Sequence, residues 1–176
     1  GDSWKPVFFC TEEIPCNPCT TVCPTKSIRL KARKGSIMDL PYFEGSDCKG
    51  CSACVAACPG LAVSLVRMAG DGMAEVRIPF EFDAGRYAIG DRLPALDRDG
   101  LPLEDAELVG KQYYKKHRTW VLTLRARPEN AARIIGLRVQ DEAVTRPLPA
   151  PRYEYLPDSA IVCRCERVTV GEIVEF

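Results

Sequence analysis

The stretch "CKGCSACVAACPG", residues 48–60, holds four cysteines followed directly by a proline. The gaps between successive cysteines are two, two and three residues. Gaps of two residues let one tight turn of backbone direct three thiolates at a single metal centre, whereas the fourth cysteine has already turned away. The proline cannot continue a helical hydrogen-bond pattern, so it sets the exit of the chain. This spacing predicts a metal-binding turn.

An incomplete copy of this run lies earlier in the chain. Residues 16–30, "CNPCTTVCPTKSIRL", match residues 51–65, "CSACVAACPGLAVSL", at a constant offset of 35 positions. The match includes three cysteines, the proline after them and the apolar residues that follow. Two copies of one small unit are expected to stack into a core that neither could form alone.

The distribution of cysteines favours metal over disulfides. The chain has ten cysteines in 176 residues, and none lies between Cys58 and Cys163. A disulfide framework would be spread over the fold that it stabilises. Structural zinc sites usually use two separated pairs of ligands, which fits interlocked triples poorly. The pattern therefore indicates metal clusters in a reducing compartment, and we expect the cytoplasm.

The spacing also predicts which cysteines act together, because the fourth cysteine of such a run ligates the other cluster in two-cluster proteins. The first copy has Glu13 where its next ligand is expected, so we expect residues 11–15 to loop out and Cys10 to replace it. Alternatively, the first cluster is a three-iron form or uses another ligand. The expected first set is Cys10, Cys16, Cys19 and Cys58, and the second is Cys23, Cys48, Cys51 and Cys54.

On these motifs, residues 8–68 resemble a bacterial-type ferredoxin with two [4Fe–4S] clusters. The second motif is complete, whereas the first departs from the family pattern by its long gap between Cys10 and Cys16. The resemblance implies two β-hairpins and two short helices around the clusters. It also implies transfer of single electrons at low potential.

The last residues contain a separate motif, "CRCERVTVGEI", at 163–173. Thr169 and Glu172 form a capping box that predicts a helix start, where the helix dipole favours thiolates. The motif resembles the opening of a bacterioferritin-associated-ferredoxin-like (BFD-like) [2Fe–2S] domain. That resemblance implies a third cluster on Cys163 and Cys165, completed by residues beyond this chain. The alternative is a surface strand with two free cysteines.

Composition divides the chain into four segments and predicts an α+β fold. Residues 1–68 form the expected ferredoxin-like domain, and 69–146 alternate in hydrophobicity as strands of a small β-barrel or sandwich do. Pro79 favours an edge strand for its segment, and residues 128–136 favour a short helix that begins near Pro128. The proline-rich segment 147–157 is expected to be a stiff linker, and 158–176 begins the incomplete BFD-like domain.

The remaining features exclude several functions. Lys plus Arg equals Asp plus Glu at 24 each, so no overall basic field favours nucleic acid. No apolar run has the ~18 residues that a membrane helix needs. The run around His117, the single histidine, could be a docking patch for an acidic partner, although a solvated loop between strands is the commoner arrangement. No catalytic triad or phosphate loop is found, and no basic helix pair supports a redox-sensing DNA binder.

Together the segments resemble the iron–sulfur subunits of multi-subunit FAD-dependent dehydrogenases, such as opine, hydroxyproline and sarcosine oxidases and hydrogen cyanide synthase. The resemblance implies that the chain is not catalytic alone and relays single electrons from FAD on a partner subunit, in a hetero-oligomer. The alternative is a free, soluble ferredoxin-type carrier that serves several enzymes. Such a carrier would need neither the β-rich segment nor the linker.

Overall fold

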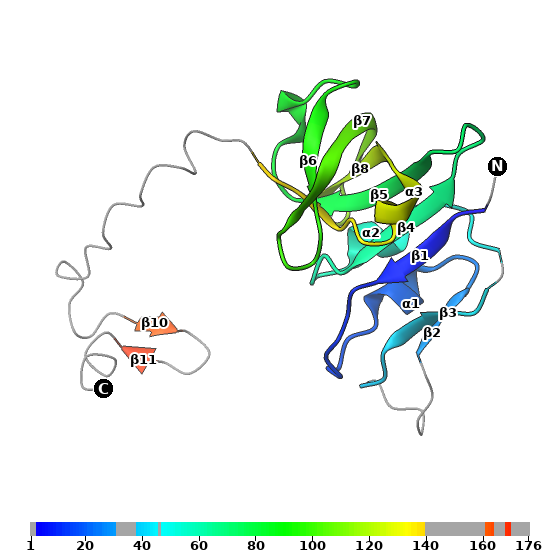
Figure 1. Cartoon of the computed structure of the whole chain (residues 1–176). Helices are drawn as coiled ribbons and strands as arrows, with labels where there is room; N and C mark the ends of the chain where they lie inside the picture. The colour runs from blue at the N-terminus through cyan, green and yellow to red at the C-terminus, as the bar shows by residue number, and fades with distance from the viewer. Residues whose placement is uncertain (1–2, 31–37, 46, 140–160, 164–167, 170–176) are drawn as a thin grey trace. The chain divides into compact units, whose positions relative to one another are not determined.

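The structure is a computed structural model that describes residues 3–30, 38–45 and 47–139, together with the backbone of 161–163 and 168–169. The chain divides into two compact units, Gly1–Arg138 and Val139–Phe176. The described part is mostly strands with a few short helices (Figure 1). None of its helices has the length and apolar character needed to cross a membrane.

One antiparallel sheet of seven strands runs through the first unit. Its spatial order is β1-β4-β5-β8-β7-β6-β9. The sheet curls, because β9 at one edge contacts β5 in the middle. The strands are β1 (Lys5–Phe8), β4 (Val63–Met68), β5 (Ala74–Phe80), β6 (Arg92–Leu96), β7 (Pro102–Tyr114), β8 (Thr119–Ala126) and β9 (Gly136–Leu137).

The cysteine-rich part lies against the β1 end of this sheet (Figure 1). Helix α1 (Pro18–Val22) packs against helix α2 (Ala53–Ala57), and β2 (Ile28–Leu30) pairs with β3 (Pro41–Phe43). The strand pairs β1–β4 and β2–β3 and the two short helices agree in number with the elements that the ferredoxin resemblance implies.

The repeat is longer in the structure than in the sequence motif. Helices α1 and α2 lie 35 positions apart, and so do β2 and the first three residues of β4. Pro6–Phe8 of β1 and Pro41–Phe43 of β3 follow the same offset. The two loops between strand and helix differ in the position of their first cysteine. Cys10 lies two residues after β1, whereas Cys48 lies five residues after β3.

The ferredoxin-like and β-rich segments share the main sheet. Strands β4 and β5 lie on either side of the expected boundary at 68 and 69, yet they pair from Leu65–Arg77 to Met68–Ala74. The expected boundary between residues 68 and 69 therefore falls inside one sheet, because the backbone hydrogen bonds between β4 and β5 connect the two sides. Residues 1–138 form one unit with one continuous sheet.

The alternation predicted for Val76, Ile78, Phe80 and Phe82 holds in β5 through Phe80, whereas Phe82 lies after the strand and is 56% exposed. The edge position predicted from Pro79 was wrong. Val76 and Ile78 are fully buried, and β5 pairs with both β4 and β8. Pro79 is tolerated because the pairing with β4 ends at Arg77, two residues before it, so no β4 carbonyl requires a donor there.

Two further predictions concern helices. Helix α3 (Pro128–Ala131) begins at Pro128, as the sequence predicts, and ends before Gly136. A 3-10 turn, η1 (Ala84–Arg86), follows β5. In the second unit β10 (Ile161–Cys163) pairs with β11 (Val168–Thr169), so Thr169 lies in a strand, and the helix expected after it lies outside the described residues.

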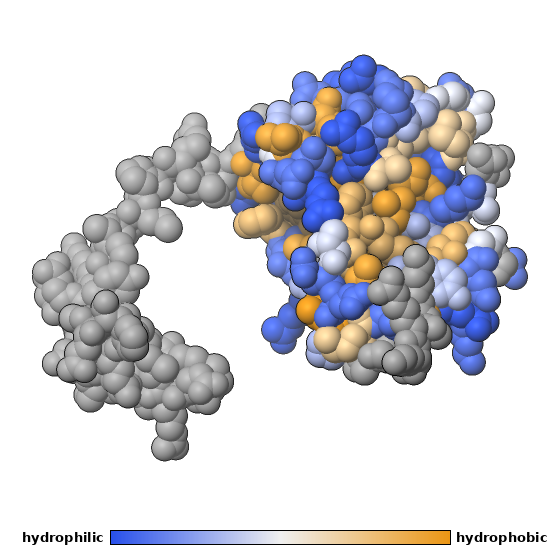
Figure 2. Space-filling model, turned by 60° about the horizontal axis from the view of Figure 1, so that its bottom comes forward, coloured by the Kyte–Doolittle hydropathy of each residue, from blue (hydrophilic) through white to orange (hydrophobic). Residues whose placement is uncertain are grey.

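The surface of the first unit mixes apolar and polar side chains (Figure 2). Large apolar side chains lie exposed on several separate elements and loops rather than on one strand face. They are Ile14, Met38, Phe82, Ile89, Leu101 and Tyr113.

Candidate functional site

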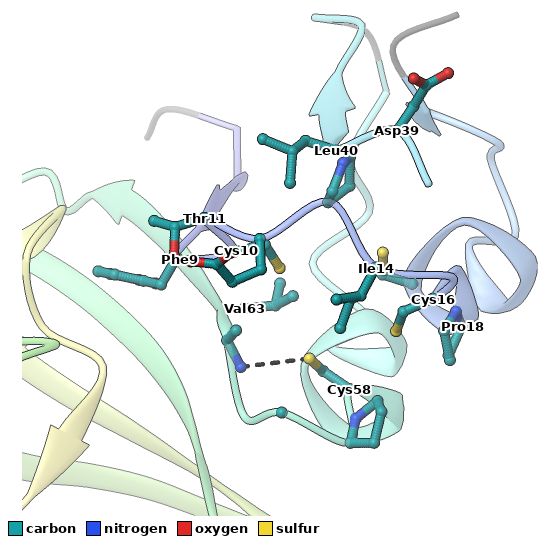
Figure 3. Close-up of a pocket in the computed structure, with 16 residues that line it drawn as sticks. Phe9, Cys10, Thr11, Ile14, Cys16, Pro18, Asp39, Leu40, Cys58 and Val63 are labelled. Carbon is teal, nitrogen blue, oxygen red and sulfur yellow. Dashed lines mark hydrogen bonds between the residues drawn. The ribbon is translucent and has the colours of Figure 1, made fainter. Parts of the chain in front are cut away.

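Four cysteines from distant parts of the chain line one cavity of about 270 Å³. Cys10 follows β1, Cys16 precedes α1, Cys19 lies in α1 and Cys58 follows α2. The close-up shows Cys10, Cys16 and Cys58 around the same space, with Val63 beside it (Figure 3). This is the first set expected from the spacing, and the structure brings all four of its members together.

The backbone of the main sheet positions Cys10. The N–H of Phe9 donates to the carbonyl of Ala62 at 2.9 Å, which extends the β1–β4 ladder by one step. The N–H of Ala62 in turn donates to Sγ of Cys58 at 3.3 Å (Figure 3). Cys10 therefore reaches the cavity because its strand is registered against the residues that follow Cys58.

The other four cysteines of the first unit line a second, narrower cavity of about 20 Å³. Cys23 follows α1, Cys48 and Cys51 lie in the loop before α2, and Cys54 lies within α2. Lys49 is the charged residue among those that line this cavity. This is the second set expected from the spacing. Because the cavity is narrow, its thiols would have to separate to admit a cluster.

Burial and mutual repulsion affect the thiols of both sets. Burial, and then repulsion from Cys58 and Cys10, raise the pKa of Cys19 to about 11. Burial, and then repulsion from Cys48, Cys51, Cys23 and Cys19, raise the pKa of Cys54 to about 12. Such clusters of thiolates repel one another unless a cation lies between them, so the grouping favours a bound metal centre.

Cys23 behaves differently from the other cysteines. Its burial raises the pKa, but hydrogen bonds from Thr25 and from the backbone of Ser27 and Ile28 together outweigh burial, so the pKa is lowered. Its Sγ lies 3.4 Å from Oγ1 of Thr25. The thiolate of Cys23 is thus favoured, in contrast to those of Cys19 and Cys54.

The donor sets suit iron–sulfur clusters better than a single ion. Each cavity is surrounded by four thiols, the ligands that cubane clusters take. Among the described residues, no group of three or more His, Cys, Asp or Glu is arranged to hold a single metal ion. Ligands placed around a cavity match a cluster, whose irons lie apart from one another.

Apolar side chains, two of them from β4 of the main sheet, line the two cavities. Val63 lines the first cavity, and Ile28 and Leu65 line the second. These residues and Val55 are almost completely buried in one cluster with Cys19 and Cys54. Pro59 lines the first cavity and Pro24 the second, next to the cysteines that they follow. Such a shell excludes water and influences the potential of a cluster.

Three residues near the second set were not identified from sequence. Arg77 in β5 donates from Nη1 to the carbonyl of Gly50 and, at 3.2 Å, to Oγ of Ser52. The hydroxyl of Tyr114 in β7 donates to the carbonyl of Cys51 at 2.6 Å. Trp4 packs against Gly50, where an added Cβ would lie 2.6 Å from its Nε1. The alternation in β5 predicts that Arg77 points to the other face of the strand from Val76 and Ile78. No local sequence pattern predicts that it contacts the loop that carries Gly50 and Ser52.

The basic run around His117 forms the turn between β7 and β8. The side chains of Lys115, Lys116 and Arg118 are exposed, as expected for a solvated loop, and a docking role for them remains untested. Cys163 ends β10, its side chain is not among those described, and Cys165 lies outside the described residues.

Comparison with known proteins addresses the first unit. Residues 14–62 match the 4Fe-4S dicluster domain family. The chain contains a ferredoxin-type 4Fe-4S domain. Over 52 residues it is 36% identical to the ferredoxin-type protein NapF of Haemophilus influenzae, a stretch that covers 30% of this chain and 29% of that relative. The chain thus spans less than a third of the relative's length. No solved structure matches this chain.

The 4Fe-4S domain agrees with the interpretation of the cysteine-rich segment, and it supports an iron–sulfur electron carrier. The matched range begins after Cys10 and includes the other seven cysteines of the two sets. The assignment of Cys10 therefore depends on the geometry at the end of β1.

The pKa differences predict an order of thiol reactivity in the iron-depleted protein. At pH 8 we expect Cys54 to be alkylated more than about tenfold more slowly than Cys23, because alkylation requires the thiolate and burial keeps Cys54 protonated. Iodoacetamide labelling followed by peptide mass spectrometry measures both rates. Above pH 9 the difference should narrow, because Cys23 is already largely ionised while the thiolate fraction of Cys54 still rises toward its pKa of about 12. Equal rates at pH 8 in folded protein would contradict the described environments.

Proposed function

We propose that this chain is the iron–sulfur electron-transfer subunit of an FAD-dependent amine or amino-acid dehydrogenase complex. The observation that carries the proposal is the pair of four-cysteine cavities within one 4Fe-4S domain. Cys10, Cys16, Cys19 and Cys58 would hold one [4Fe–4S] cluster, and Cys23, Cys48, Cys51 and Cys54 the other. Such clusters, when bound, accept and release one electron at a time.

The protein's own residues would bind and insulate these centres. The eight thiolates anchor the two sets, and the buried Val55, Val63 and Leu65 keep water away from them. Repulsion on Cys54 from Cys19 of the other set indicates that the two sets are neighbours. Proximity of this kind favours electron transfer from one set to the other. No residue of this chain is assigned to substrate chemistry, which belongs to the FAD-containing partner.

The β-rich segment supports a subunit rather than a free carrier. Electron transfer through two cysteine sets needs only residues 8–68, yet β4 continues into a sheet with β5–β9. A [2Fe–2S] cluster on Cys163 and Cys165, completed beyond this chain, would add a third centre. A free ferredoxin-type carrier in the cytoplasm is the second candidate, and the similarity to NapF over the cysteine-rich part favours it as much as the first.

Anaerobic affinity capture of the full-length protein from its native host distinguishes the two candidates. We expect a flavoprotein in stoichiometric amount, seen by its visible absorbance and identified by mass spectrometry. Addition of that flavoprotein's substrate should then bleach the cluster absorbance. A brown protein that elutes alone, with iron and sulfide but without flavin, would contradict the subunit role and support the free carrier. Capture on a resin without the tagged protein is the control.

A further inference from the structure

Arg77 connects the main sheet to the loop that carries the second cysteine set. It lies in β5, is half-buried, and donates to the carbonyl of Gly50 and the hydroxyl of Ser52. Both acceptors lie between Cys48 and Cys54. The guanidinium therefore contacts the backbone turn that presents three of the four thiols.

Trp4 fixes the orientation of this guanidinium. The Cζ of Arg77 lies 4.1 Å from the ring centroid of Trp4, within the range of a cation–π interaction. Trp4 is buried and lies directly against Gly50. The position of Arg77 relative to the cysteine loop is thus set by an aromatic ring as well as by two hydrogen bonds.

Arg77 and its neighbour Arg67 differ in the groups that their guanidinium groups contact. Arg67 also lies over Trp4, at 4.6 Å, but it is paired with Glu75 at 2.7 Å. The hydrogen-bond acceptors that the structure gives Arg77 are a carbonyl and a hydroxyl, which are uncharged. Arg77 therefore places a positive charge at the loop of Cys48, on which it acts electrostatically, and its own hydrogen bonds go to no carboxylate. Glu75, the ion-pair partner of Arg67, also attracts Arg77 but through space only.

The residues that line the two cavities also make the second cavity the more positive of the two. Glu12 and Asp39 are the charged residues that line the first cavity, with the Asp39 carboxylate directed away from the cysteines (Figure 3), whereas Lys49 lines the second. Reduction adds a negative charge to a cluster. A nearby cation stabilises the reduced form and raises the reduction potential, and a nearby anion lowers it.

We propose that the positive charge of Arg77 raises the reduction potential at the second cysteine set above that at the first. The second set is then the one that is reduced first and stays reduced. This inference depends on the two ligand sets proposed above. A one-electron donor would first reduce the first set. That electron would then pass to the second set, which reoxidises the first and reduces the second, and no proton is required.

A redox titration followed by EPR tests the proposal on the full chain, purified anaerobically with its clusters. The wild type should show two one-electron midpoints. Arg77→Gln should lower only the higher midpoint, by at least a tenfold change in equilibrium constant, which is about 59 mV for one electron. Iron and sulfide content should stay unchanged. Arg77→Lys keeps the charge and should recover most of the shift.

Arg67→Gln is the matched control, since it removes a second arginine from the same tryptophan ring but one that is paired with Glu75. It should move the higher midpoint much less than Arg77→Gln does. If Arg77→Gln does not retain its clusters, Arg77→Lys decides: a higher midpoint far below the wild-type value despite the retained charge would overturn the proposal.

The other outcomes separate this inference from the proposed function. If Arg77→Gln keeps both clusters but moves neither midpoint, or moves the lower one, the role of Arg77 is overturned and the ligand sets stand. If the wild type holds only one cluster, the ligand assignment itself fails and the inference fails with it. Absence of a flavoprotein partner would leave the two midpoints unaffected.

Discussion

Replacing Cys58 with alanine is expected to abolish the first cluster and leave the second intact, although Cys58 belongs to the second cysteine run. The reason is its position beside Cys10, Cys16 and Cys19. Iron per chain should fall from about eight to about four, the content of one cubane. Iron and acid-labile sulfide analysis, with EPR of the reduced protein, measures the loss.

The reciprocal variant makes this test sharper. Cys23→Ala should remove the cluster of the second run, because Cys23 lines the second cavity with Cys48, Cys51 and Cys54. If Cys58→Ala instead removed the cluster of its own run, ligation would not be crossed. If it removed neither, Cys58 would not be a ligand.

Ser64→Ala is a suitable control for both cysteine variants. Ser64 is buried in β4, and its hydroxyl has no hydrogen-bond partner among the described residues. Its loss removes one buried polar atom without breaking a hydrogen bond, so both clusters and the stability should be retained.

Gly50→Ala is expected to destabilise the protein by at least ~2 kcal/mol and to impair loading of the second cluster. Gly50 has a φ of +66°, which an alanine adopts only with strain, and the added Cβ would lie 2.6 Å from Nε1 of Trp4. Trp4 cannot easily move away, because it is buried and lies beneath Arg67 and Arg77. Thermal unfolding by circular dichroism should show a Tm lower by several degrees, at ~2–4 °C per kcal/mol for a chain of this size.

Gly70→Ala provides the comparison for this change. Gly70 lies in the turn between β4 and β5, and a Cβ there would meet no atom within 4 Å. It should leave the Tm and the iron content close to those of the wild type. A Gly50→Ala protein as stable and as rich in iron as Gly70→Ala would show that the contact between Trp4 and the cysteine loop is not needed.

Much of the site could be predicted from short-range spacing. Three cysteines separated by gaps of two residues can reach one centre whatever surrounds them, since the covalent chain alone limits their separation. The repeat at offset 35 reappears as α1 and α2, and the alternation of Val76, Ile78 and Phe80 reappears as the buried face of β5. These features are local, so the sequence determined them by itself.

Other features were decided only by the tertiary structure. The sequence predicted Cys10 in the first set, but what carries it to the cavity is the bond from Phe9 to Ala62, which aligns its strand with the residues after Cys58, and no spacing rule contains that register. Trp4, Gly50 and Arg77 meet because β1 and β5 flank β4 in one sheet. Pairing between strands far apart in sequence depends on the packing of the whole unit. The spacing of the cysteines therefore predicted the two sets, whereas the charged neighbour of the second set emerged only from the assembled sheet.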